Sequence, residues 1–520
     1  MMSIVGISFL LAVPIAASWY VGIRIVAARR MRERRTTHRW APEPPPLRTD
    51  APPLHLETAV PSAGPRHPDA RALYARARRS RMYAAALYLL AGLMAACVLA
   101  WCELLSGEHF DVAERLGLVL NHSWPAALTV IAVALPSFRR KLLAYAVAAT
   151  VIFLGMWAVE DMQSWLEAAW APTLLLLLVM NRWLKTIAPL LVIPTLAVIF
   201  AVVVAVGGVM EDSWLGATVL APIVLACAAI VLVAIVRGYE RKRFSDLSFQ
   251  LGFLWAVFSF WYMADELVDV WWAAFAAIGA YGLTTFLAVP VLRRAALQHR
   301  PASLLVLRVF GAPSRTHRLF EEVGTRWRTI GPIHLIAGTD SIVINLDISE
   351  LAHMVTMRSR TLYVSDKANL ERRLAGLDTA PDPDGRYRTN DFFCFDDTWK
   401  PTFTQLLVRS DAVLVDLSGY GPQNAGVAFE LAHLLARRPL DSFVLMTDDT
   451  TNANYLSATL TRLWRELDPS LPNARIQRPV LRVLHNPHPR NLVAALCDAA
   501  VAGGWRDERH PVAQRQPAPA

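Results

Sequence analysis

The sequence predicts two parts: a multi-pass α-helical membrane domain, followed by a C-terminal α/β domain with a mainly parallel, doubly wound sheet of the flavodoxin or Rossmann type. Up to about residue 294, apolar runs of roughly 20 residues alternate with short charged loops, and each run is long enough to cross a bilayer as a helix. From residue 303 onward, short apolar runs alternate with stretches of helical periodicity. That second pattern is typical of a parallel sheet covered by helices on both faces.

Nine apolar runs are predicted to span the membrane. Hydrophobic residues make up 54% of the chain, which is more than one ordinary soluble enzyme needs. The first run is interpreted as a retained helix, because its basic cluster follows the apolar stretch, whereas the charge of a signal peptide precedes it. The predicted spans are residues 4–27, 83–103, 117–136, 142–159, 164–181, 187–210, 214–236, 248–264 and 271–292. They form a first transmembrane helix, residues 1–28, and a membrane domain, residues 83–294.

The loops alternate in charge, which predicts the orientation of these spans. Loops after odd-numbered spans are basic, as at residues 29–35 and 241–243, and loops after even-numbered spans are acidic, as at residues 160–161 and 211–212. Cytoplasmic loops are enriched in Lys and Arg, so we expect an inner-membrane protein with its N-terminus outside and its C-terminal domain in the cytosol. The bilayer is therefore a predicted partner. Because the net charge of +9 is spread over loop ends, nucleic acid is not.

The remaining segments and the cysteines carry fewer signals. Residues 36–81 are rich in Pro and Arg and poor in large apolar residues, which predicts a flexible cytosolic linker, and residues 506–520 are predicted to be a disordered tail. The five cysteines form no CxxC pair and have no His at metal-ligand spacing, so neither a metal site nor a cofactor is predicted. The spans contain almost no charge at mid-depth, which argues against a pump or transporter.

The α/β domain is predicted over residues 299–505. Its expected strands are residues 304–310, 333–337, 391–395, 412–417, 442–446 and 480–484, and its expected helices include residues 314–327, 349–358, 366–377, 399–409 and a helix beginning at Asn424. Ligands of such sheets bind beyond the carboxyl ends of the strands. After the first strand, this rule selects Gly311, Ser314 and Arg315 as candidate ligand contacts.

The segment from Asp411 to Leu435 is the most informative part of the chain. An apolar strand ends near Asp416, and the loop that follows contains Ser418; the strand-end rule selects both as candidate ligand contacts. A helix then begins at Asn424, which is a favourable N-cap residue. At about 100° per residue, Glu430 falls beside the apolar stripe of this helix, where a carboxylate is half-buried. Two interpretations are open: Glu430 is a functional group near the strand ends, or it pairs with a cation such as Arg437 or merely flanks the core.

This segment resembles a known family. A strand ending in Asp, a Gly-containing loop and the run Asn-Ala-Gly-Val-Ala-Phe-Glu-Leu at residues 424–431 are similar to the nucleoside 2-deoxyribosyltransferase-like group and to wider TIR-like nucleotide-binding α/β domains. The resemblance implies that Glu430 is the catalytic nucleophile at a sugar's anomeric carbon. It also implies ligand contacts at Asp416, Asn424 and Gly426. It covers about 25 residues strongly, and the membrane region resembles no family that we recognise.

Two functions follow as hypotheses. The first is a membrane-anchored cytosolic domain that recognises a nucleoside or NAD-like ligand and cleaves its N-glycosidic bond through Glu430, in the manner of an N-glycosidase or deoxyribosyltransferase-like hydrolase. The alternative is a non-catalytic signalling or scaffold protein whose α/β domain binds a nucleotide or a protein. The sequence leaves the ligand and the oligomeric state open. Asp382 to Gly385 is interpreted as a turn, and the histidines 485 and 488 as lone loop residues.

Overall fold

The computed structural model describes residues 51–58, 64–105, 219–265, 272–308, 323–337, 362–395 and 397–506, together with isolated helical positions elsewhere. Several predictions lie outside the described residues. These are most of the first helix, most of the third to sixth spans, the C-terminal tail, the helix at residues 349–358, and the candidate contacts Gly311, Ser314 and Arg315.

The C-terminal part is built on one eight-stranded sheet in which every neighbouring pair of strands is parallel. The strand order is β1-β8-β7-β6-β2-β3-β5-β4. The strands are β1 (His55–Thr58), β2 (Leu304–Arg308), β3 (Ile333–Ala337), β4 (Tyr363–Val364), β5 (Thr389–Cys394), β6 (Ala412–Asp416), β7 (Phe443–Thr447) and β8 (Val480–His485). The predicted parallel α/β sheet is confirmed, with six of its strands close to the expected positions; β1 and β4 were not predicted.

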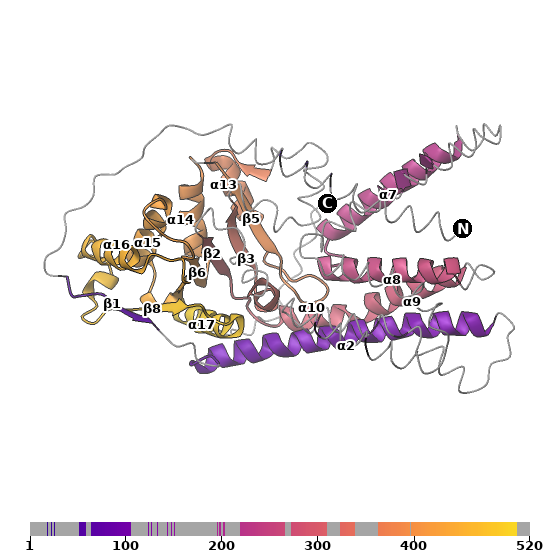
Figure 1. Ribbon diagram of the computed structural model, residues 1–520, viewed down its shortest axis with the longest axis horizontal. Helices are drawn as coiled ribbons and strands as arrows, with labels where there is room; N and C mark the ends of the chain where they lie inside the picture. The colour runs from indigo at the N-terminus through magenta and orange to yellow at the C-terminus, as the bar shows by residue number, and fades with distance from the viewer. Residues whose placement is uncertain are drawn as a thin grey trace.

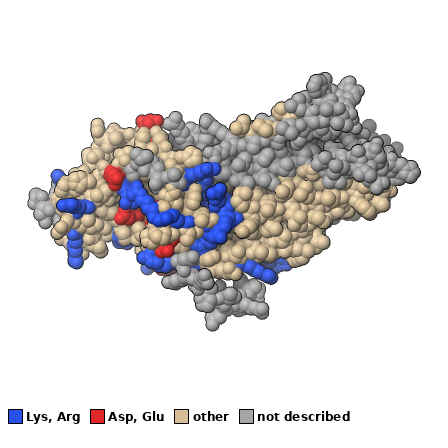
Figure 2. Space-filling view, turned by 90° about the horizontal axis from the view of Figure 1, so that it is seen from below, with Lys and Arg blue, Asp and Glu red and all other residues tan. Residues whose placement is uncertain are grey.

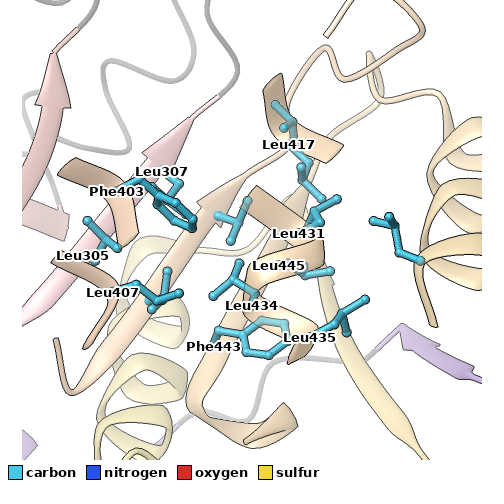
Figure 3. Close-up of a cluster of buried hydrophobic side chains, with 14 of the residues drawn as sticks. Leu305, Leu307, Phe403, Leu407, Leu417, Leu431, Leu434, Leu435, Phe443 and Leu445 are labelled. Atoms are coloured by element: carbon cyan, nitrogen blue, oxygen red, sulfur yellow. The ribbon is translucent and has the colours of Figure 1, made fainter. Parts of the chain in front are cut away.

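Alternate side chains of the strands enter two separate apolar cores, one on each face of the sheet. On β2, Leu305 and Leu307 belong to one core, whereas Leu304 and Val306 belong to the other. This alternation follows from the two-residue period of a strand. Figure 3 shows the first core, where Leu431, Leu434 and Leu435 lie over strand residues. Helices α13 (Lys367–Ala375), α14 (Trp399–Arg409), α15 (Ala425–Arg437) and α16 (Ala453–Arg465) cover this face, and α17 (Pro489–Ala502) covers the other.

A group of long apolar helices extends from one end of the α/β part (Figure 1). The described helices are α2 (Pro68–Leu104), α7 (Ala221–Glu240), α8 (Asp246–Asp265), α9 (Trp272–Ala288) and α10 (Pro290–Leu297). Within the described part of the chain, three helical stretches are long and apolar enough to cross a membrane: Pro68–Cys102, Ala221–Glu240 and Trp272–Leu297. Large apolar side chains on them face outward, including Ile230 on α7 and Phe286 on α9. Burial in lipid would remove this surface from water.

The structure differs from the predicted flexible linker at β1. Residues 55–58 form the edge strand beside β8, and the carbonyl of Pro52 accepts a hydrogen bond from Trp464 Nε1 at 2.9 Å. Leu54 and Leu56 pack against the first apolar core. The sequence did not predict β1 for two reasons. The average composition of residues 36–81 is polar in spite of these two leucines, and the hydrogen bonds of an edge strand come from a partner strand that is distant in the sequence.

The same segment also contains the first third of α2, which begins at Pro68 instead of near residue 83. Ala70, Leu73 and Ala77 are almost fully buried and lie in the second core, beside Leu492 and Leu496 of α17. Their spacing places them on one helical face. Because arginines surround this small apolar stripe, the average composition of the segment is polar although one face packs on the domain. Helix α2 therefore runs continuously from the α/β part into the apolar helices (Figure 1).

Candidate functional site

The strand order places a topological switch point at the centre of the sheet. From β2 the chain moves to β3 on one side, whereas β6, β7 and β8 follow one another on the other side. Helix α15, which follows β6, packs on one face of the sheet, whereas Val323 and Trp327, between β2 and β3, pack on the other. A crevice at such a point is the usual ligand site of open α/β sheets. Arg308 and Asp416 are neighbours in register at this carboxyl edge. Of the predicted contacts, those after β6 are the ones that the structure describes.

Asp416 organises the turn that follows β6. Its side chain is buried, and its Oδ1 accepts hydrogen bonds from the backbone N–H of Ser418 at 3.0 Å and from the Ser418 hydroxyl at 2.6 Å. Gly419 then has a φ of 72°, a conformation that L side chains rarely adopt. The structure therefore brings the predicted residues Asp416 and Ser418 into direct contact, within a tight turn that directs the backbone back across the edge of the sheet.

The start of α15 lies beyond this turn. Asn424 is the N-cap residue, as predicted, but its side chain accepts no hydrogen bond from the first turn of the helix; its Oδ1 accepts one from the N–H of Gly421 at 3.0 Å. Gly426 faces the indole of Trp399, because a Cβ at this glycine would lie 3.7 Å from the ring. The N–H groups at the start of α15 thus remain a source of partial positive charge at this end of the helix.

Glu430 lies one turn further along α15 and is only 6% exposed. Its Oε2 is buried and has no hydrogen-bond partner among the described residues. Burial raises the pKa of this carboxyl group from 4.5 to about 8. No ion pair joins it to Arg437 within the described part of the chain, so the pairing that was one alternative is not present. Glu430 is a buried acid with an unused acceptor, which is costly for folding alone.

The protonation of Glu430 limits what it can do chemically. A carboxyl group with a pKa near 8 is neutral at pH 7 and can donate a proton or a hydrogen bond. The nucleophilic role that the resemblance implies needs the ionised form. Binding of a cationic or positively polarised ligand would favour ionisation, because an adjacent positive charge lowers the pKa of a carboxyl group.

A second polar cluster lies at the ends of β7 and β8, and the sequence analysis missed it. His485 Nε2 lies 3.2 Å from Asp449 Oδ1, and its Nδ1 lies 3.3 Å from the hydroxyl oxygen of Thr447. Asn486, with a φ of 44°, also donates to Asp449 at 3.0 Å. The interpretation of His485 as a lone loop residue is therefore wrong. Its partner lies 36 positions earlier in the chain, and only the parallel pairing of β7 with β8 brings the two together.

Among the residues that the structure describes, no group of three or more His, Cys, Asp or Glu side chains could hold a metal ion. The fold and the site together define a class: a parallel α/β domain, with a polar switch-point edge, joined to helices that are apolar and long enough to cross a membrane. No family model, curated protein or solved structure matches the chain.

Proposed function

We propose that this chain is a multi-pass inner-membrane protein whose cytosolic α/β domain recognises a nucleotide at the carboxyl edge of its sheet. The observation that carries the proposal is the position of Asp416 and its turn at the switch point beside β2. A buried carboxylate next to a helix N-terminus suits a ligand with both sugar hydroxyls and phosphate groups: the carboxylate accepts from hydroxyls, and helix N–H groups donate to phosphate.

The membrane part of the proposal is supported by two independent features. Outward-facing large apolar side chains occur along α2, α7 and α9, where an aqueous environment would disfavour them. The charge alternation of the loops adds the orientation, with the basic loops and the α/β domain in the cytosol.

Ligand-induced thermal stabilisation tests the recognition function. The full-length protein in detergent is the appropriate sample, because a fragment beginning at residue 299 would lack β1 and the first turns of α2, which pack on the domain. We expect NAD, AMP or a nucleoside to raise the melting temperature of the wild type, and Asp416→Asn to lose that shift. Asp441→Asn, an exposed carboxylate outside this edge, is the matched control and keeps it. If none of these compounds stabilises the wild type, nucleotide recognition is wrong.

Cleavage of an N-glycosidic bond by Glu430 is the second candidate function. It is favoured by the buried Oε2 atom of Glu430, which has no hydrogen-bond partner among the described residues, and by the resemblance of residues 424–431. Incubation of the full-length protein with NAD would release nicotinamide if cleavage occurs. Glu430→Gln would abolish release, whereas Glu371→Gln on the exposed surface of α13 would not. Equal release by the wild type and Glu430→Gln contradicts the catalytic role and leaves the alternative, a non-catalytic signalling domain.

A further inference from the structure

Arginines from several elements converge where the α/β domain meets the apolar helices. The carbonyl of Ala77 on α2 accepts a hydrogen bond from Thr329 at 3.5 Å, so the segment at residues 323–330 lies against this helix. The N–H of Tyr387 in turn donates to the carbonyl of Arg328 at 2.6 Å. Arg81 lies one helical turn beyond Ala77. Seen from below, Lys and Arg gather midway along this face, between the α/β part and the apolar helices (Figure 2).

The positive charge of Arg81 is poorly compensated. Its Nε atom is buried and has no hydrogen-bond partner among the described residues. Arg326, Arg490 and Arg386 lie close enough to repel it. Of the described groups that act most strongly on Arg81, only Tyr74 favours its charged form. A buried guanidinium group among other cations is unfavourable unless an anion accompanies it.

The carboxylates nearest to this junction have partners already. Asp246 binds Arg328 through two hydrogen bonds, of 2.7 and 3.0 Å. Asp382 accepts from Arg388 at 2.8 Å, and Asp384 accepts from the Ser245 hydroxyl at 2.6 Å. Arg386 also interacts electrostatically with Asp384 and Asp246. These acids hold the domain to the helices, and the excess of arginine remains on the side of Arg81.

A second unpartnered donor comes from α10. The Nε atom of Arg293 is buried and has no hydrogen-bond partner among the described residues. The preceding residue, Leu292, packs in one apolar cluster with Ala84 and Ala85 of α2. Its carbonyl oxygen would lie 3.0 Å from a Cβ at Gly385, immediately before Arg386. Helix α10 thus lies beside both α2 and the loop that contains Arg386, and Arg293 is next in sequence to this contact.

We propose that this arginine cluster binds the phosphate of an anionic lipid headgroup, with Arg81, Arg293, Arg326, Arg386 and Arg490 as the cationic residues. Guanidinium groups match phosphate oxygens in geometry as well as in charge. The depth of Arg81 relative to the proposed bilayer is also appropriate for this contact. It lies two residues before the span predicted at residues 83–103, and lipid headgroups lie at the end of a span. This inference rests on the proposed membrane insertion and not on the ligand at the sheet edge.

Nanodiscs of defined composition test the proposal with the full-length protein. We expect nanodiscs that contain phosphatidylglycerol to raise the melting temperature above its value in pure phosphatidylcholine. Native mass spectrometry should find phosphatidylglycerol retained on the wild type. Arg490→Gln, on the exposed end of α17, and Arg81→Gln should each weaken retention about fivefold, in line with the contribution of one basic residue near a membrane surface. Arg465→Gln on α16 removes the same charge elsewhere and should change nothing.

The source of the phosphate and the membrane insertion are checked separately. If millimolar inorganic phosphate stabilises the protein in phosphatidylcholine as well as phosphatidylglycerol does, the site takes free phosphate and the lipid proposal is overturned. Retention that is equal in wild type and Arg490→Gln overturns it too, since the cluster then contributes nothing. Equal weakening in Arg490→Gln and Arg465→Gln also overturns it, since the effect is then general surface charge. Extraction of the chain from membranes by alkaline carbonate would overturn membrane insertion itself and would leave the sheet-edge experiment unaffected.

Discussion

At the edge of the sheet, the residues that surround a carboxyl group determine what it can do chemically. Glu430 is next to the apolar stripe of α15, as helical periodicity predicts, and the surrounding core makes it a neutral acid. Asp416 is buried as well, but Ser418 donates two hydrogen bonds to it, whereas the Oε2 atom of Glu430 has no hydrogen-bond partner among the described residues. Two carboxyl groups of one strand–helix unit are thus suited to different roles.

The protonation of Glu430 predicts a pH dependence of stability. Its pKa is about 8 in the folded state and near 4.5 when unfolded, so the unfolded chain releases this proton first as pH rises. The free energy of unfolding should therefore fall between pH 4.5 and 8, by roughly 1.4 kcal/mol per pH unit from this group, and stay level above pH 8. Glu430→Gln removes that slope. Thermal unfolding of both proteins at pH 5 and pH 8 checks this. The stability of the variant relative to the wild type should be greater at pH 8 than at pH 5, and an equal change of stability with pH in the two proteins would contradict a neutral Glu430.

The turn at Asp416 gives a second prediction at this scale. Ser418→Ala removes the 2.6 Å hydrogen bond between the Ser418 hydroxyl and a buried carboxylate. We expect a loss of about 1–3 kcal/mol in the free energy of unfolding, because the carboxylate loses a donor inside the protein. Urea unfolding measures it. Ser457→Ala on the exposed face of α16 is the matched control and should have little effect; equal losses would mean that the turn is not what Ser418 stabilises.

At the scale of elements, the loop between α13 and β5 joins the domain to the apolar helices. The sequence identifies Asp382 to Gly385 as a turn, and the structure confirms it with a hydrogen bond of 2.9 Å from the Gly385 N–H to the Asp382 carbonyl. Gly385 of this turn lies against Leu292 of α10. The same loop also contacts the junction of α7 with α8, where Arg388 donates to the carbonyl of Tyr239 and Lys242 pairs with Asp378. A segment that the sequence identifies only as a turn is therefore a contact between two parts of the molecule.

Gly385→Ala tests this contact. Its φ is 76°, and a Cβ would approach the Leu292 carbonyl oxygen to 3.0 Å. We expect a loss of at least about 1 kcal/mol from the left-handed backbone conformation, and faster amide hydrogen exchange in both the loop and α10. Gly504→Ala is the control, because that glycine also has a positive φ but has nothing within 4 Å of its Cβ position. If exchange in α10 is unchanged in Gly385→Ala, the loop does not transmit strain to the helices.

At the scale of the whole molecule, one buried ion pair connects α8 with the domain. Arg328 and Asp246 are each about 15% exposed, at a separation of 2.7 Å. Asp246→Asn leaves the Arg328 charge buried without its partner and should cost about 3–5 kcal/mol in unfolding free energy. The double variant with Arg328→Met should recover most of that loss. Glu371→Gln, which breaks the exposed Lys367–Glu371 pair of α13, should cost less than about 1 kcal/mol. Losses of similar size in the two single variants would mean that the buried pair contributes no more than a surface pair.

The predicted orientation is testable by cysteine labelling in a background without the five native cysteines. A cysteine at Ser457, exposed on α16, should react with an impermeant reagent only after permeabilisation, whereas one at Ser106 should react in intact cells. Ser245, at the start of α8, is unsuitable because it is buried against Asp384. Labelling of Ser457 in intact cells would reverse the topology and remove the cytosolic nucleotides from reach of the domain.

The sequence alone determined the apolar helices, the parallel α/β class, most of the strands and the position of Glu430 beside the core. These features depend on periodicity and hydrophobicity, which are local properties of the chain. The tertiary structure decided what depends on distant partners. It placed β1 beside β8 and paired His485 with Asp449. Among the described residues, it also left the Oε2 atom of Glu430 without a hydrogen-bond partner and gathered arginines around Arg81. Hydrogen-bond partners, desolvation and charge repulsion arise between residues that are far apart in the sequence, so no local pattern contains them.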